Sequence, residues 1–212
     1  MNRLPLHQDL YLIAHDQAGK PLIHQSSLAL GLAGAVLLDL ALGGYVAVAG
    51  GQGAVTRLPP TGDAIGDDLL SDVARGNPHK SVTSLIKKAA DGIHERTRAA
   101  LLASGVLVRV SKRRLGMLPY TRYQLADIAS VVRASSGVRS AVEGWKPPDA
   151  RCAALCGLVA VLRLEEELYL DLPAARLLAR LREIASAGSP VIDGLVADVD
   201  TLVAEAAVAV YR

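Results

Sequence analysis

The chain contains no phenylalanine, and among its 212 residues there are only one tryptophan, two methionines and two cysteines. A core without phenylalanine has to be built mainly from Ala, Val, Leu and Ile, whose side chains suit the packing of helix on helix. The two cysteines, Cys152 and Cys156, are too few for a disulfide framework or a zinc site with four cysteine ligands. We therefore expect a single, mainly helical domain over residues 1–212 in a reducing compartment.

The first ten residues, MNRLPLHQDL, contain no apolar segment of signal-peptide length and no small-residue cleavage pattern. This favours a cytoplasmic protein. The formal net charge of +2 is too small to indicate a partner by itself, so only local clusters of charge can be informative.

Charge is nearly absent from residues 26–56, where the only charged side chain is Asp39. A membrane span would place this carboxylate near its centre, at a cost of roughly 2.5 to 3.5 kcal/mol. The Gly43-Gly44 pair also interrupts the helical pattern, and no aromatic belt flanks the apolar run. We expect a buried helix followed by a hairpin.

Helical periodicity dominates the rest of the chain. We expect helices over residues 5–14, 26–42, 63–76, 81–89, 91–104, 126–142, 148–164, 173–187 and 190–211. Ser26 or Ser27 is the expected cap of the second helix, and Ser81 that of the fourth. Two hairpins are predicted, one around Gly50-Gly51-Gln52-Gly53 and one over residues 106–123 with its turn at residues 111–114.

No catalytic constellation is apparent. Ser84 and Lys87 match S-x-x-K, but neither S-D-N nor K-T-G follows. The five histidines include no H-E-x-x-H motif, and we expect each to be a surface or half-buried side chain. The three acids at 165–167 are typical of a solvated surface. We predict a non-enzymatic protein without a catalytic residue, a metal site or a cofactor.

Acidic residues are absent between Arg96 and Arg122, a segment that holds seven basic residues. Such a run is ordinarily a solvated face. Here, however, the basic cluster is followed by apolar residues near the predicted hairpin tip, and a basic collar around an apolar tip suits an anionic bilayer surface. The alternative is a winged-helix-like nucleic-acid-binding protein, with the helix at 91–104 on DNA and the hairpin as the wing.

Four segments together resemble one protein family. They are DLYLIAHD near the N-terminus, GLAGAVLLDLALGG, PPTGDAIGDDLL and HERTRAALLASGVL, and they occur in the family's order within residues 5–125. The family is that of Golgi phosphoprotein 3, whose members are peripheral membrane proteins that bind phosphoinositides. The short chain and its composition rich in Ala, Gly and Val resemble a bacterial member.

The resemblance implies a helical bundle ringed by amphipathic helices, with a hairpin that reaches the membrane. Eukaryotic members bind phosphatidylinositol 4-phosphate and link glycosyltransferase tails to coatomer. The positions of the family's lipid-pocket residues carry other residues in this chain, namely His24 for a tryptophan and Ala33, Asp91 and His94 for three arginines. Losing three permanent cations and gaining an acid predicts that specific recognition of this phosphoinositide is not retained.

The resulting hypothesis is a cytoplasmic protein that associates peripherally with the inner face of the membrane. It predicts that general anionic lipid binds to the second hairpin, through Arg109, Lys112, Arg113, Arg114, Leu115 and Met117. Anionic lipid is the partner we expect, whereas nucleic acid is the alternative. A protein partner and a homo-oligomer stay open.

Overall fold

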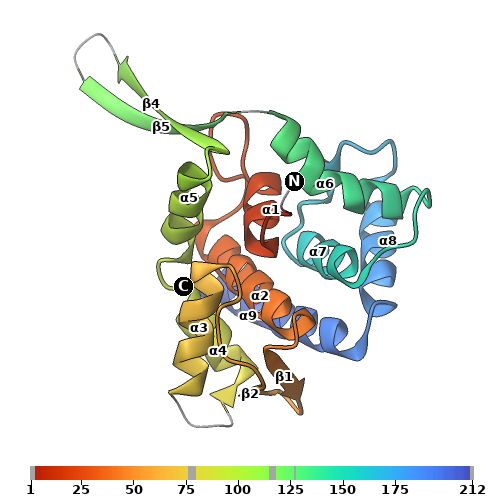
Figure 1. Cartoon of the computed structure of the whole chain (residues 1–212). Coiled ribbons are helices and arrows are strands. Elements are labelled where there is room, and N and C mark those ends of the chain that lie inside the picture. The colour runs from red at the N-terminus through yellow and green to blue at the C-terminus, as the bar shows by residue number, and fades with distance from the viewer. Residues whose placement is uncertain (1–2, 76–79, 115–117, 127, 211–212) are drawn as a thin grey trace.

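The computed structural model describes residues 3–75, 80–114, 118–126 and 128–210. Within these residues the helices are α1 (Leu6–Ile13), α2 (Gln25–Leu42), α3 (Ala64–Ala74), α4 (Val82–Ala90), α5 (Ile93–Ala103), α6 (Ile128–Val142), α7 (Ala150–Val161), α8 (Ala174–Ser186) and α9 (Pro190–Val210), with a short 3₁₀ helix, η1 (Glu165–Leu168). The strands are β1 (Val46–Ala49), β2 (Gln52–Val55), β3 (Lys80–Ser81), β4 (Leu107–Arg114) and β5 (Leu118–Leu125). The mainly helical fold class is confirmed, and Figure 1 shows the β4–β5 hairpin projecting from one end of the helical body.

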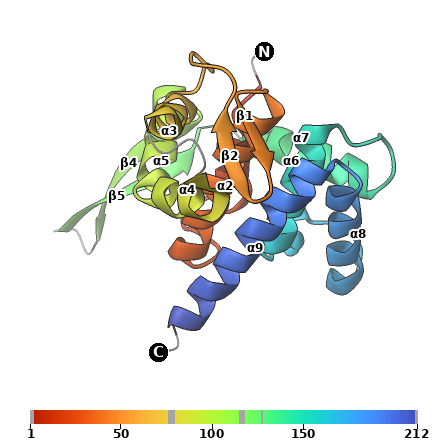
Figure 2. The ribbon, with the colours of Figure 1, turned by 90° about the horizontal axis from the view of Figure 1, so that it is seen from below.

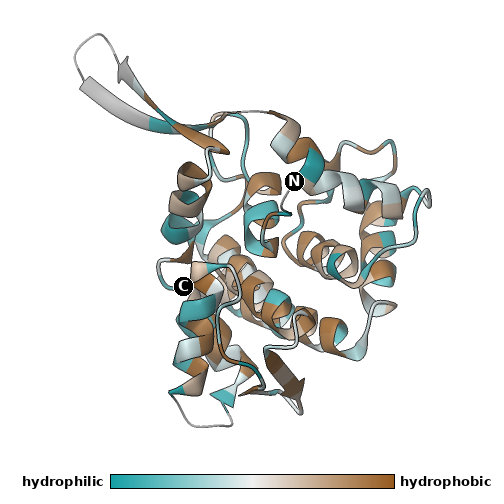
Figure 3. Cartoon of the chain, viewed as in Figure 1, coloured by the Kyte–Doolittle hydropathy of each residue, from teal (hydrophilic) through white to brown (hydrophobic). Residues whose placement is uncertain are grey.

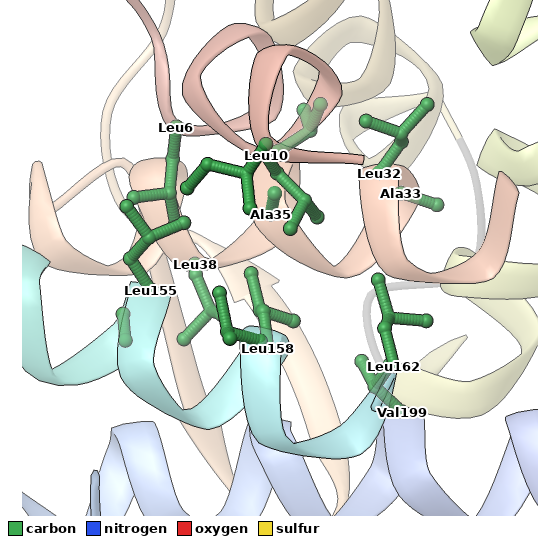
Figure 4. Packing of buried hydrophobic residues seen from close by; sticks show 14 of the residues in the cluster. Leu6, Leu10, Leu32, Ala33, Ala35, Leu38, Leu155, Leu158, Leu162 and Val199 are labelled. Atoms are coloured by element: carbon green, nitrogen blue, oxygen red, sulfur yellow. The ribbon is translucent and has the colours of Figure 1, made fainter. Parts of the chain in front are cut away.

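Helix α2 lies at the centre of this body, in contact with α1, α4, α7 and α9. Its residues 30–38 are all buried, and Figure 4 shows Leu32, Ala33 and Leu38 packed among side chains of α1, α7 and α9. By length and composition alone α2 could cross a membrane, but 61% of it is buried inside the fold. The prediction of a buried helix followed by a hairpin is therefore confirmed. Figure 3 shows the hydrophobic residues that line α2.

Small residues let two other segments approach α2 closely. A Cβ atom added at Gly31 would lie 2.6 Å from Leu162 Cδ1, and one added at Gly34 would lie 2.4 Å from Val199 Cγ2. Both distances are shorter than van der Waals contact, so only glycine permits this packing. Figure 2 shows α9, which carries Val199, running as a long diagonal across α2.

The first hairpin is built on a two-residue turn. Gly50 and Gly51 have φ values of 58° and 71°, and Ala49 pairs with Gln52 across them. Positive φ at both central residues is the requirement of a type I′ turn, which glycine meets without steric cost. Strand β3, which pairs with β2 through Lys80 and Ser81, was not predicted because two residues carry no detectable periodicity.

The predicted helix caps are partly confirmed. Ser81 accepts a hydrogen bond from the backbone N–H of Ser84, 3.2 Å away, as expected for a cap of α4. The prediction that Ser26 or Ser27 caps α2 is wrong. His24 is the cap, because its ring Nδ1 accepts from the backbone N–H of Ser26 at 3.4 Å, as a hydroxyl oxygen would.

Three histidines contradict the prediction that each is at the surface or half-buried. His7, His15 and His94 are all buried, because other side chains and a backbone carbonyl replace water as their hydrogen-bond partners. Glu165 is also buried, against the expectation of a solvated acidic cluster, and its carboxylate accepts from Arg163 Nε at 3.2 Å.

Candidate functional site

The β4–β5 hairpin is longer than the sequence indicated. Eight antiparallel pairs run from Leu107 opposite Leu125 to Arg114 opposite Leu118. The prediction of a turn at residues 111–114 is therefore wrong, since these residues continue strand β4 and residues 115–117 connect the strands. Segment 111–114 contains no glycine, asparagine or proline, the residues that favour a tight turn.

The structure describes one of the six predicted hairpin residues with its side chain, three through their backbone alone, and two not at all. Arg109 has an exposed side chain on β4, and Arg122 is exposed on β5. Lys112, Arg113 and Arg114 are placed through their backbone in β4, but their side chains lie outside what the structure describes. Leu115 and Met117 lie outside the described residues.

Tyr123 contacts two parts of the helical body at the base of the hairpin, where Leu107 is also buried in the core. The guanidinium of Arg98, on α5, lies 4.4 Å from the centre of the Tyr123 ring, a cation–π contact. On another side, a Cβ atom at Gly19 would lie 1.8 Å from the carbonyl oxygen of Tyr123, and Gly19 has a φ of 75°. The segment after α1 thus packs directly against the backbone of β5.

Three aromatic rings stack next to this base. Those of Tyr11 and His15 have centres 3.8 Å apart and planes 17° apart, and the ring of His94 lies 5.2 Å from both. His15 Nδ1 lies 2.7 Å from the carbonyl oxygen of Tyr11, which can only accept, so Nδ1 carries the proton. His15 Nε2 then accepts from His94 Nε2–H, 3.0 Å away. Burial disfavours the charged ring and lowers the pKa of His15 to about 4.

Contacts formed in the folded chain offset part of the positive charge of the basic segment 96–122. Arg96 donates to the carboxylate of Asp68 on α3, and Arg98 is held over Tyr123. The absence of acids from the sequence between 96 and 122 therefore overstates the exposed positive charge of α5. Arg109 and Arg122 of the hairpin are exposed.

Asp39, the acid within the central apolar segment, belongs to a buried polar network. It accepts hydrogen bonds from the backbone N–H of Leu6 and from Arg151 Nη1 on α7. The other terminal nitrogen of Arg151 donates to Asp9 Oδ2 at 3.1 Å. Burial raises the pKa values of both Asp9 and Asp39, and the Arg151 guanidinium opposes that effect. This network ties α1, α2 and α7 together.

Asp63, the acid of the PPTGD segment, also has a structural role. Its carboxylate accepts from the backbone N–H of Gly66 at 3.0 Å, which caps α3, and lies 3.1 Å from His7 Nε2. The other ring nitrogen of His7 lies 3.0 Å from Thr97 Oγ1 on α5. Burial by itself would raise the pKa of Asp63, but hydrogen bonds from His7 and the backbone lower it overall.

Asp39 and Asp63, which lie in two of the four motif segments, therefore stabilise the helical scaffold that carries the hairpin. A family model described as Golgi phosphoprotein 3 matches residues 6–209 of the chain. The chain belongs to the Golgi phosphoprotein 3 family. No curated protein gives a significant match to it.

The four positions at which the Golgi phosphoprotein 3 family resemblance placed a lipid pocket have different surroundings here. His24 is an exposed helix cap and Asp91 is exposed after α4. Ala33, labelled on α2 in Figure 4, is completely buried, and His94 is buried in the ring stack. The cavities described for this chain around Arg151 and Tyr169 are not lined by any of these residues. That these positions no longer form a phosphoinositide pocket stays a prediction.

Proposed function

We propose that this member of the Golgi phosphoprotein 3 family associates with membranes and binds anionic lipid in general through the β4–β5 hairpin. One observation carries the proposal: the hairpin stands away from the helical body while its base is anchored by Arg98 and Gly19 at Tyr123. A projecting segment that is rigid at its base can enter a bilayer surface without disturbing the helical core. Like the family, this protein is proposed to act as a non-enzymatic adaptor.

Charge supports a lipid partner of this kind. The hairpin contains Arg109, Lys112, Arg113, Arg114 and Arg122, and no acid lies within its strands. Each basic residue near an anionic membrane surface contributes about 1 kcal/mol, an attraction that salt screens. The apolar residues Leu115 and Met117, between the strands, would add burial in the bilayer.

The alternative of a winged-helix-like nucleic-acid binder has less support. It requires α5 to present its basic residues to DNA. Arg98 is instead held over the ring of Tyr123, and Arg96 pairs with Asp68 in an exposed contact that offsets part of its charge.

Vesicle flotation tests the proposal. The wild-type protein should float with anionic vesicles and much less with neutral ones, and phosphatidylinositol 4-phosphate should add no more than its charge. The double variant Arg109→Glu/Arg122→Glu should bind anionic vesicles at least about tenfold more weakly, because two attractions become repulsions. Met117→Asp should also weaken binding. Arg176→Glu, an exposed change on α8, is the matched control and should bind as the wild type does.

Two results would contradict the proposal in different ways. Flotation with no vesicle at all, or with the phosphoinositide vesicle alone, refutes general anionic-lipid binding. A steeply salt-dependent affinity for duplex DNA that is insensitive to Met117→Asp would favour the winged-helix alternative.

A further inference from the structure

A second feature, separate from the hairpin, is a cavity of about 660 Å³ beside the N-terminal segment. It lies among the segment before α1, helices α6 and α7, and the residues after α5, which Figure 1 shows close to the label N. Its volume falls within the range of small-molecule sites. Its wall carries three arginines, one acid, Asp9, and three serines, and the rest is mainly apolar.

Arg133 provides the positive charge that the fold leaves most available here. Its Nη2 donates to Ser130 Oγ at 2.7 Å, and among the described residues it makes no ion pair with an acid. Arg3, also in the wall, pairs with Asp149 at 3.1 Å, where both side chains are more than half exposed. An exposed pair of this kind contributes little to stability and can be exchanged for a ligand.

Arg151, which also lines this cavity, has one hydrogen-bond donor without an acceptor among the described residues. Its terminal nitrogens donate to Asp9, Asp39 and the Leu4 carbonyl, so the two carboxylates more than offset its single positive charge. Its Nε is buried and has no acceptor within the described part of the chain. Buried donors are nearly always paired, because an unpaired one costs about 1–3 kcal/mol. An oxygen atom of a bound ligand is an acceptor of the kind that this nitrogen lacks.

Gly137 is a position from which the cavity can be filled by substitution. It lies in the interior of α6, where glycine is about 1 kcal/mol less favourable than alanine. A Cβ atom added there would meet nothing within 4 Å, so neighbouring elements do not require a glycine. Gly137 lines the cavity, so a large side chain at this position would occupy part of its volume.

The geometry points to a binding site for a phosphate-bearing amphiphile in this cavity. The phosphate would lie at Arg133, Ser130 and Arg3, because its several oxygens can accept from two guanidinium groups and a hydroxyl at once. The apolar part of the ligand would contact Leu4, Val106, Val138 and Leu155, which also line the cavity. The phosphate could come from a lipid headgroup or from a soluble ester, and the site does not depend on the hairpin.

Calorimetric titration of the full chain tests this site with two probes, inorganic phosphate and dibutyryl phosphatidic acid, a water-soluble phospholipid. We expect Arg133→Gln to weaken binding at least about tenfold, because hydrogen bonds to a charged group are lost. Gly137→Leu should fill the cavity and weaken binding similarly, with an unchanged or higher melting temperature. Arg139→Gln, on the same helix but outside this cavity, is the matched control.

The two probes distinguish the sources of the phosphate. Tighter binding of the phospholipid, lost in both variants, supports a lipid ligand, whereas equal binding of both probes, lost in both variants, supports a soluble phosphate. Binding of neither probe by the wild-type protein, or equal binding by wild type and both variants, overturns the inference. The hairpin variant Arg109→Glu/Arg122→Glu should bind both probes normally, so a failure of the membrane proposal would be seen separately.

Discussion

The stability of this protein should fall between pH 6.5 and pH 4 because of one buried histidine. His15 has an unfolded-state pKa of 6.5 and a folded-state pKa of about 4, caused mainly by burial. Between these values the unfolded chain binds a proton that the folded one does not, so the free energy of unfolding decreases as the pH falls. Each pKa unit corresponds to about 1.4 kcal/mol, so the whole shift amounts to about 3 kcal/mol.

Urea unfolding at a series of pH values from 7.5 to 4.5 measures this effect. The variant His15→Asn removes the titrating ring and keeps a side-chain N–H that can donate to the Tyr11 carbonyl. Its unfolding free energy should depend less on pH, by up to about 1.4 kcal/mol per pH unit below pH 6.5. Asp9 and Asp39 have raised pKa values, which act in the opposite direction, but they are present in both proteins and cancel in the comparison.

The matched control is Ile13→Val, which removes one buried methylene at the end of α1, two residues before His15, and no titrating group. It should lower stability by about 0.5–1.5 kcal/mol at every pH, giving a curve parallel to that of the wild type. If the His15→Asn curve were also parallel to the wild-type curve, the buried neutral histidine would not be the source of the pH dependence, and the reasoning would be refuted.

Three further variants test the scaffold by urea unfolding. Asp39→Ala should lower the free energy of unfolding by about 3 kcal/mol, because it leaves Arg151 partly unpaired. Adding Arg151→Met should recover part of this loss. A double variant less stable than Asp39→Ala would contradict the prediction. Gly34→Ala should lower the free energy of unfolding by about 1–3 kcal/mol, because the added methyl group clashes with Val199. Combining it with Val199→Ala should relieve that clash. If the losses of the two single variants simply added in the double variant, the two residues would not be in direct contact. Gly51→Ala should cost about 1 kcal/mol, because φ is 71° there; unchanged stability would exclude the type I′ turn.

Features set by neighbouring residues could be predicted from the sequence. The apolar run that forms α2, the Gly50-Gly51 turn and the Ser81 cap each depend on residues within a few positions of one another. The length of β4 could not be predicted in this way. Residues 111–114 form strand because they pair with residues 118–121, and a basic polar segment shows no alternation that would reveal this.

The candidate hairpin was predicted as a segment, but its anchoring was not. Nothing near Tyr123 in the sequence indicates that Arg98 and Gly19 converge on it. The burial of His15 and His94 was missed for the same reason, since a lone histidine has no periodic pattern and its partner lies 79 residues away.

The sequence by itself determined the helices, the tight turns and the family, because hydrophobic periodicity, glycine conformation and motif order are local properties of the chain. The tertiary structure alone decided which charges and rings are neutralised or buried. Asp39 pairs with Arg151, which lies 112 residues further along the chain, and Arg96 pairs with Asp68 of another helix. Electrostatic interactions depend on distance in space and on the exclusion of water, and both arise only when the helices pack together.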